Sequence, residues 1–175
     1  MKTLVCYTSL SGFTKSYAEW IAESLCADLL PLRSVKKEML PLYDLIIYGG
    51  SLHAVGINGI KFIKNQIPKL KNTRLVIFAV GASPVKEGIC DETLNGNFTQ
   101  EEQNRITLFY LRGGFDYTRL NLYNKMLMKM LKLKLSLKKS RTSDERGMLA
   151  AFDKPVNFTG REKLHDLLQY VRSIQ

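Results

Sequence analysis

Apolar positions recur along this chain with two periods, one typical of buried strands and one of amphipathic helices. Short apolar runs predict strands over 4–7, 29–32, 44–50, 75–80 and 106–111. Apolar residues three and four positions apart predict helices over 13–26, 58–66 and 161–173, with a short helix within 85–105. The segment 35–42 contains Pro41 and is expected to be short or irregular. This alternation predicts an α/β domain with a mainly parallel sheet.

The first strand runs into a small polar loop and then into the first helix. Residues 7–15 read Tyr-Thr-Ser-Leu-Ser-Gly-Phe-Thr-Lys. Backbone amides at a helix N-terminus lack partners and attract phosphate, and the hydroxyls of Ser9, Ser11 and Thr14 can donate further hydrogen bonds. Gly12 allows a tight turn. The spacing is neither GxxxxGK[ST] nor GxGxxG, and the alternative interpretation is a polar turn that caps the helix.

Placed after the first strand, Ser9-x-Ser11-Gly12-x-Thr14 resembles the FMN-phosphate loop of flavodoxins. The resemblance implies a doubly wound five-stranded parallel sheet of order 2-1-3-4-5, a single domain over 1–175, and FMN as the cofactor. Ligands of such sheets bind at the carboxyl ends of the strands. The resemblance assigns FMN binding to residues of three loops. These residues are Ser9, Leu10, Ser11, Gly12, Phe13 and Thr14 in the first loop, Ser51, Leu52, His53 and Ala54 in the second, and Ala82, Ser83 and Pro84 in the third.

The second and third of these loops lack the aromatic residues that flavodoxins usually stack on the flavin ring. His53 has the one planar ring there, and it is expected to stack on the flavin, to hydrogen-bond it, or to lie in solvent. The acidic run typical of the loop after the fourth strand is also missing. Tight stacking and a strongly lowered semiquinone potential are therefore not expected.

Positive charge is concentrated in one part of the chain. The formal net charge is +10, and the segment from Arg105 to Arg141 holds ten Lys or Arg residues and one acid, Asp116. Such a segment suits anionic partners. Within it, apolar residues at helical spacing over 120–132 predict a basic amphipathic helix, which is typical of a membrane surface or an anionic partner. The alternative is a surface helix with a solvated basic face. Over 131–139 leucine and lysine alternate, so that strand and helix both remain open.

This basic insert, taken as about 117–147, is similar to an insert found in one branch of the flavodoxin-like proteins. Arg112-Gly-Gly-Phe-Asp-Tyr, followed by Tyr123-Asn-Lys-Met-Leu-Met-Lys-Met-Leu-Lys, is similar to the long flavodoxin-like menaquinone-dependent protoporphyrinogen IX dehydrogenases of bacteria. The resemblance implies an FMN-dependent oxidoreductase that oxidises an anionic tetrapyrrole and passes electrons to a membrane quinone. Residues expected at the substrate or at an anionic membrane are Arg112, Arg119, Lys125, Lys129 and Lys132. No catalytic side chain is expected.

Other functions are weighed against this one. A flavodoxin-type electron carrier for a redox partner protein is the alternative, although a net charge of +10 is unusual for one. A receiver domain would need acidic residues after the first and third strands, where Thr8-Ser9 and Gly50-Ser51 stand. A nucleic-acid binder would lack a recognition motif here.

The cysteines and histidines of the chain offer no redox pair and no metal-binding cluster. Cys6, Cys26 and Cys90 form no CxxC pair, and the two histidines with no clustered Cys or carboxylates predict no metal site. The N-terminal residues do not resemble a signal peptide, so a cytoplasmic location is expected, with peripheral contact at the inner face of the cell membrane.

Overall fold

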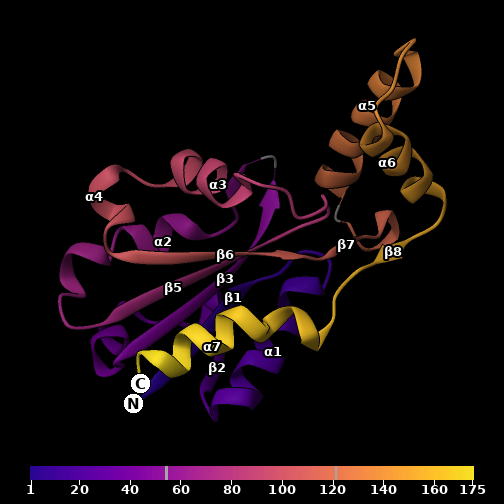
Figure 1. Cartoon of the computed structure of the whole chain (residues 1–175). Helices are drawn as coiled ribbons and strands as arrows, with labels where there is room; N and C mark the ends of the chain where they lie inside the picture. The colour runs from indigo at the N-terminus through magenta and orange to yellow at the C-terminus, as the bar shows by residue number, and fades with distance from the viewer. Residues whose placement is uncertain (54, 121) are drawn as a thin grey trace.

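The computed structural model of the chain describes residues 1–53, 55–120 and 122–175 (Figure 1). Its central sheet contains five parallel strands, in the spatial order β2 (Asp28–Pro31), β1 (Thr3–Thr8), β3 (Leu45–His53), β5 (Arg74–Gly81) and β6 (Ile106–Arg112). The two-residue strand β4 (Gly56–Ile57) pairs antiparallel with the end of β3. Counted along the parallel strands alone, this is the predicted order 2-1-3-4-5, so the α/β flavodoxin-like fold is confirmed.

Helices cover both faces of the sheet (Figure 1). One face carries α1 (Phe13–Leu25) and α7 (His165–Ser173), and the other carries α2 (Ile60–Lys64), α3 (Ile89–Asn97) and α4 (Gln100–Gln103). Short 3-10 turns complete the connections: η1 (Leu32–Ser34), η2 (Lys37–Leu42), η3 (Ile67–Lys69) and η5 (Arg161–Leu164). The segment 35–42, expected to be short or irregular, contains the single 3-10 turn η2. The last predicted helix begins as η5 and becomes α-helical at His165.

Alternate residues of each strand pack into two separate hydrophobic cores, one on each face of the sheet. Leu4 and Cys6 of β1 pack on the α2 and α3 side, whereas Val5 between them packs against α1 and α7. Side chains of successive strand residues point to opposite faces, so a strand buried on both faces is apolar throughout. This explains the continuous apolar run of β3, whose residues Leu45–Gly50 are all buried.

The basic insert forms a helical hairpin beyond the carboxyl ends of the strands (Figure 1). It contains η4 (Tyr117–Arg119), α5 (Leu122–Leu137) and α6 (Ser143–Asp153), and it extends past the predicted end at 147. The strands β7 (Gly114–Phe115) and β8 (Val156–Asn157) pair antiparallel and close its base. The alternating leucine and lysine segment is therefore helical as far as Leu137.

The helix α6 was not predicted from the polar residues that form its start. Thr142 accepts a hydrogen bond from the backbone of Glu145, at 3.2 Å, and the Glu145 carboxylate accepts one from the backbone of Thr142, at 2.9 Å. This is a capping box, whose sequence signature is Thr-x-x-Glu. The signature is present in the chain, and it marks the helix start that periodicity alone overlooks.

The close packing between β3 and β5 leads to a first prediction, which concerns the free energy of unfolding. A Cβ atom at Gly49 would overlap the buried ring of Phe78, whereas one at Gly147 in α6 would have no described heavy atom within 4 Å. We expect Gly49→Ala to lower the free energy of unfolding by about 1–3 kcal/mol through overpacking. Gly147→Ala is the control and should leave it unchanged or raise it by up to about 1 kcal/mol. Urea unfolding measures both, and equal stabilities of the two variants would contradict this packing.

Candidate functional site

A cavity of about 520 Å³ lies at the carboxyl ends of β1, β3 and β5. Its volume is within the range of roughly 300–1,000 Å³ that small-molecule sites occupy. Nine residues of the three predicted loops line it: Leu10, Ser11, Phe13, Thr14, Ser51, Leu52, His53, Ala82 and Ser83. Parallel pairing brings these loops together, because it places the carboxyl ends of all the strands at one edge of the sheet.

The loop after β1 leaves the start of α1 open to a ligand. Gly12 takes the left-handed conformation with φ of 96°, and within the described part of the chain no side chain caps the helix. The Ser9 hydroxyl oxygen accepts a hydrogen bond from the backbone of Gly12, at 3.1 Å, which closes the turn. Ser9 and Gly12 line a neighbouring hollow, together with Lys15 and Arg33, rather than the main cavity. The uncapped amides of a 13-residue helix are an anion site.

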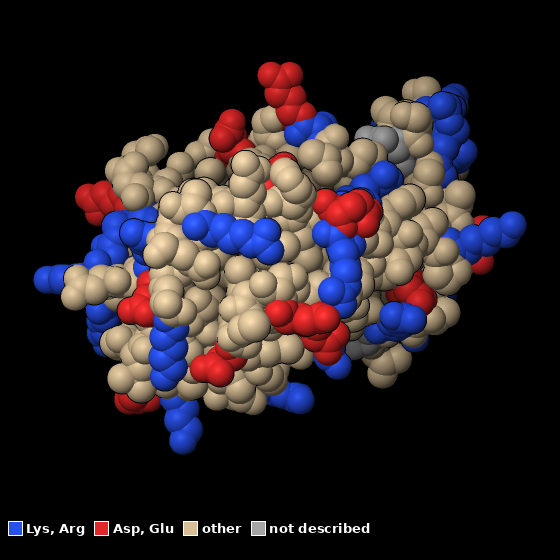
Figure 2. Space-filling view, turned by 60° about the horizontal axis from the view of Figure 1, so that its bottom comes forward, with Lys and Arg blue, Asp and Glu red and all other residues tan. Residues whose placement is uncertain are grey.

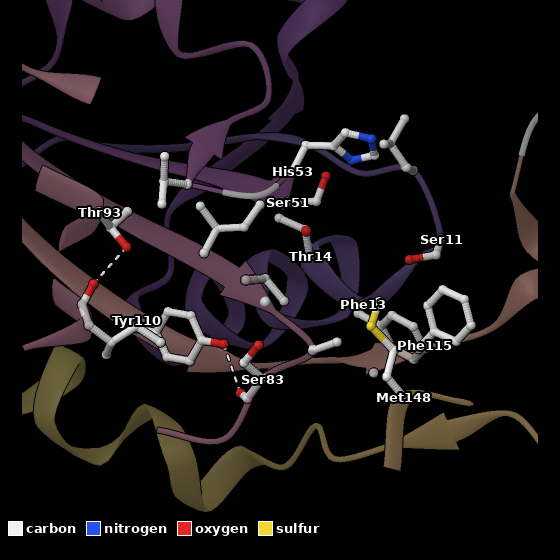
Figure 3. A pocket seen from close by; sticks show the side chains of 18 of the residues that line it. Ser11, Phe13, Thr14, Ser51, His53, Ser83, Thr93, Tyr110, Phe115 and Met148 are labelled. Carbon is white, nitrogen blue, oxygen red and sulfur yellow. Dashed lines mark hydrogen bonds between the residues drawn. The ribbon is translucent and has the colours of Figure 1, made fainter. Parts of the chain in front are cut away.

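Two hydroxyls of this loop face the cavity. Thr14 is almost fully buried yet lines the cavity, and Figure 3 shows its side chain and that of Ser11 directed into the same space. Within the described residues, neither hydroxyl forms a hydrogen bond. Both are therefore available to a ligand in the cavity.

A hydrogen-bond network fixes the first loop relative to the second. The buried hydroxyl of Tyr48 is hydrogen-bonded to the Thr8 hydroxyl, at 2.9 Å, and donates to the carbonyl of Asn58. The Asn58 side chain in turn donates to the Ser51 hydroxyl, at 2.9 Å. Burial raises the pKa of Tyr48, which keeps the phenol protonated. The network links the end of β1 to the end of β3.

The second loop is described only in part. His53 is exposed at the edge of the cavity, with its ring on the cavity side (Figure 3). Ala54, which the sequence also predicts at the cofactor, lies outside the described residues. Val55 lines the cavity and is 39% exposed.

The third loop is held by a tyrosine from the neighbouring strand. The Tyr110 hydroxyl donates to the carbonyl of Ser83, at 2.8 Å, and both residues line the cavity (Figure 3). Burial raises the pKa of Tyr110 to about 12, against the opposing effect of the Arg112 charge, so the phenol remains a donor at neutral pH. Pro84 is not among the lining residues, so its predicted contact has no support in the geometry.

Three aromatic rings line the cavity, and two of them come from elements outside the predicted loops. Phe13 belongs to the first predicted loop and stands in the first turn of α1, whereas Tyr110 comes from β6 and Phe115 from β7. No signal in the loops themselves could have revealed Tyr110 and Phe115.

The helical hairpin covers the cavity with apolar side chains rather than with its basic ones. Its contribution to the lining is Leu120, Leu127, Met128, Leu131 and Met148. None of the five basic residues predicted at the substrate is among the lining residues. The charged residues that do line the cavity are Lys86 and Glu92, which follow β5 and were not singled out from the sequence.

The predicted basic residues lie in different surroundings. Arg119 donates to the carbonyl of Ser11, at 3.4 Å, and pairs with Asp116, at 3.0 Å. Hydrogen bonds from Thr118, followed by the charge of Arg119, lower the pKa of Asp116. The Arg112 guanidinium lies 3.7 Å from the centre of the Phe158 ring. Arg119 therefore lies beside the phosphate loop, while Arg112 packs at the base of the hairpin.

The three lysines of α5 divide into two kinds. Lys132 pairs with Asp153 of α6, at 3.0 Å. Lys125 and Lys129 form no ion pair with any residue that the structure describes. Their charges are thus available on the outside of the hairpin.

Metal and thiol chemistry find no support in the described part of the chain. No group of three His, Cys, Asp or Glu side chains there could hold a metal ion. The three cysteines are free, and burial raises the pKa of the Cys6 thiol to about 12. Cys6 is a core residue of β1.

A family model described as "Flavodoxin domain" matches residues 4–143. The chain therefore belongs to the flavodoxin domain family, and this family assigns FMN to it as cofactor. Among solved structures, oxidised flavodoxin 1 from Bacillus cereus is 17% identical, with 76% of this chain and 94% of that one covered and a TM-score of 0.48. The two-electron reduced flavodoxin of Megasphaera elsdenii is 15% identical, with 63% and 84% covered and a TM-score of 0.46.

A third solved structure is a flavoprotein in complex with FMN from Lactobacillus acidophilus. It is 19% identical, with 63% of this chain and 91% of that one covered and a TM-score of 0.42. No curated protein matches the sequence significantly.

The contact between Tyr110 and Ser83 makes a second prediction. Tyr110→Phe removes the bond that holds the third loop, so we expect FMN to bind about fivefold more weakly, with a loss of about 0.5–1.5 kcal/mol in stability. Tyr170→Phe is the matched control, because its hydroxyl accepts from Thr107, at 2.8 Å, outside the cavity lining. Quenching of flavin fluorescence gives both affinities. Equal FMN affinities for the two variants would show that Tyr110 does not position the loop.

Proposed function

We propose that this chain is an FMN-dependent oxidoreductase whose helical hairpin forms an apolar cover over the flavin. The observation that carries the proposal is the composition of the cavity. The loops after β1, β3 and β5 line one side, and Leu120, Leu127, Met128, Leu131 and Met148 of the hairpin line the other. An electron carrier needs only a flavin edge that a partner can approach, whereas an apolar cover creates space for a substrate.

The phosphate of FMN would be held by the first loop. The uncapped amides at the start of α1 and the hydroxyls of Ser11 and Thr14 supply donors, and Ser9 maintains the turn at Gly12. Arg119, beside the carbonyl of Ser11, would add a positive charge close to the phosphate. Its ion pair with Asp116 holds this side chain near the loop, and charge-assisted hydrogen bonds to phosphate are strong ones.

The flavin ring would lie between the second and third loops. Ser51, Leu52 and His53 would contact it from one side, and Ala82 and Ser83 from the other. Phe13 and Phe115 extend the apolar surface next to it. When bound, FMN supplies the electron-transfer chemistry, and the chain binds and orients it and excludes water. We expect no residue of the chain to act as nucleophile or as an essential acid or base.

The substrate that we propose is protoporphyrinogen IX, with a membrane quinone as electron acceptor. In each turnover the porphyrinogen loses a pair of electrons and a pair of protons, and the quinone takes up both to become the quinol. The apolar cover suits the macrocycle, and Lys86 at the cavity could pair with a carboxylate of the substrate. The similarity of the insert to that of protoporphyrinogen dehydrogenases supports the same choice. A flavodoxin-type carrier for a redox partner protein is the alternative.

The phosphate site makes the third prediction. Ser11→Ala combined with Thr14→Ala removes two donors to a dianionic group, each of which contributes about 1.5–3 kcal/mol. We expect the FMN dissociation constant to rise at least about a hundredfold, while riboflavin, which lacks the phosphate, binds as to the parent chain. The control is Ser24→Ala, because Ser24 lies in the last turns of α1 and bonds only to the carbonyl of Trp20. Unchanged FMN affinity in the double variant would refute the assignment of the loop.

The reaction makes the fourth prediction. The FMN-loaded chain, mixed without oxygen with protoporphyrinogen IX and the soluble quinone menadione, should produce the fluorescent porphyrin with three quinols for each porphyrin, because full oxidation of the porphyrinogen removes three pairs of electrons and protons. The control is the same mixture with free FMN in place of the protein. A rate no higher than this control, together with fast reduction of an added redox protein by the reduced chain, would favour the electron carrier instead.

A further inference from the structure

The helix α5 has two apolar faces, and only one of them packs on the protein. On the inner face, Leu127, Met128 and Leu131 line the cavity and Leu135 is buried. On the outer face, six apolar residues are more than half exposed: Leu122, Tyr123, Met126, Met130, Leu133 and Leu137. At about 100° per residue these six fall on one continuous arc of about 100°. We name this arc the outer stripe.

Lysines border the outer stripe on both sides. Lys125 and Lys129 follow one edge and Lys134 follows the other, and α5 contains no Asp or Glu. Within the described part of the chain none of the three forms an ion pair. Figure 2 shows Lys and Arg gathered at the upper right end of the molecule, whereas both signs of charge mix over the rest of this face. A contiguous exposed apolar surface with basic edges indicates a specific partner.

Charge decides which partner fits. A second copy docked by the same stripe would place lysine against lysine, because a two-fold interface is formed by the same patch on both subunits. A surface of fixed negative charge over an apolar interior instead meets both the lysines and the stripe. Anionic lipid bilayers have this composition, and lysines extend their ammonium groups to the headgroups while apolar residues enter the acyl boundary.

The dimensions agree with a helix that lies on the bilayer rather than across it. The 16 residues of α5 extend about 24 Å along its axis. Among the described residues, no helix is long and apolar enough to span a membrane. Tyr123 is amphipathic, and such rings prefer the boundary between lipid and water.

We propose that the outer stripe docks the chain on an anionic lipid bilayer, with α5 parallel to its surface. The opposite face of the same helix then lines the cavity, so that the thickness of one helix, about 10 Å, separates the cavity from the lipid. A quinone dissolved in the bilayer could reach the flavin by passing α5. This link to the quinone rests on the function proposed above, whereas the lipid contact rests on the surface of α5.

Co-sedimentation of the FMN-loaded full chain with vesicles tests the inference. The vesicles are phosphatidylcholine with or without phosphatidylglycerol. We expect binding to the anionic vesicles and little to the neutral ones. Lys125→Glu, Lys129→Glu and Lys134→Glu together should weaken vesicle binding at least about tenfold, because each basic residue near an anionic surface contributes favourable free energy to membrane binding. The control reverses Lys61, Lys69 and Lys71, which are also exposed and lie outside the hairpin, and should weaken binding far less.

A second variant separates the stripe from general charge. Met126→Ser, Met130→Ser and Leu133→Ser should lose vesicle binding while keeping FMN and menadione turnover in solution, because these residues do not line the cavity. Equal loss in both charge-reversal variants, equal binding to both vesicle types, or dimer formation without vesicle binding would overturn the inference. If the unsubstituted chain turns over menadione but binds neither kind of vesicle, the lipid contact is wrong and the proposed function stands. If the unsubstituted chain binds anionic vesicles but shows no turnover, the lipid contact stands and the proposed function is wrong.

Discussion

Parallel pairing of β1, β3 and β5 is the constraint on which the site depends, because it delivers three loops to one edge of the sheet. The register from Thr8 through Gly50 and Ser51 to Val80 fixes where each strand ends. The two cores on either side of the sheet hold this register, since a shift by one residue would exchange the buried faces. The loop after β1 then meets the uncapped start of α1, whose backbone amides are placed to attract an anion.

The helical hairpin adds the apolar cover and the outer stripe to the domain formed by the central sheet and its helices. It is tied to the body by the short β7–β8 ladder and by Arg119 beside the first loop. Phe152 of α6 lies 5.1 Å from Phe115 and 5.6 Å from Tyr117, measured between ring centres, so an aromatic cluster holds the hairpin at its base. The apolar cover and the outer stripe therefore belong to the same element, and α5 serves both the cavity and the outer surface.

Sequence reasoning succeeded where one local signal determined the outcome. The apolar runs of the strands, the polar loop with Gly12 and the periodic helix α1 each carry their own pattern, and the order of the sheet came from the resemblance of the loop to that of flavodoxins. The Leu-Lys alternation after Leu131 did not identify a helix, because a helix with two apolar faces has no single hydrophobic stripe. Tyr110, Phe115 and Lys86 were missed for a different reason. Tyr110 and Phe115 reach the cavity from β6 and β7, and Lys86 lies in the loop after β5 just beyond the predicted residues, so only the fold shows that all three face the cavity.

The proposed function depends above all on the loop after β1 binding the phosphate of FMN. Titration of FMN and of riboflavin, each followed by flavin fluorescence with the full chain, tests it most directly. We expect saturable one-to-one binding of FMN and much weaker binding of riboflavin, because the phosphate contacts distinguish the two. Equal affinity for both flavins, or no binding of either, would contradict it.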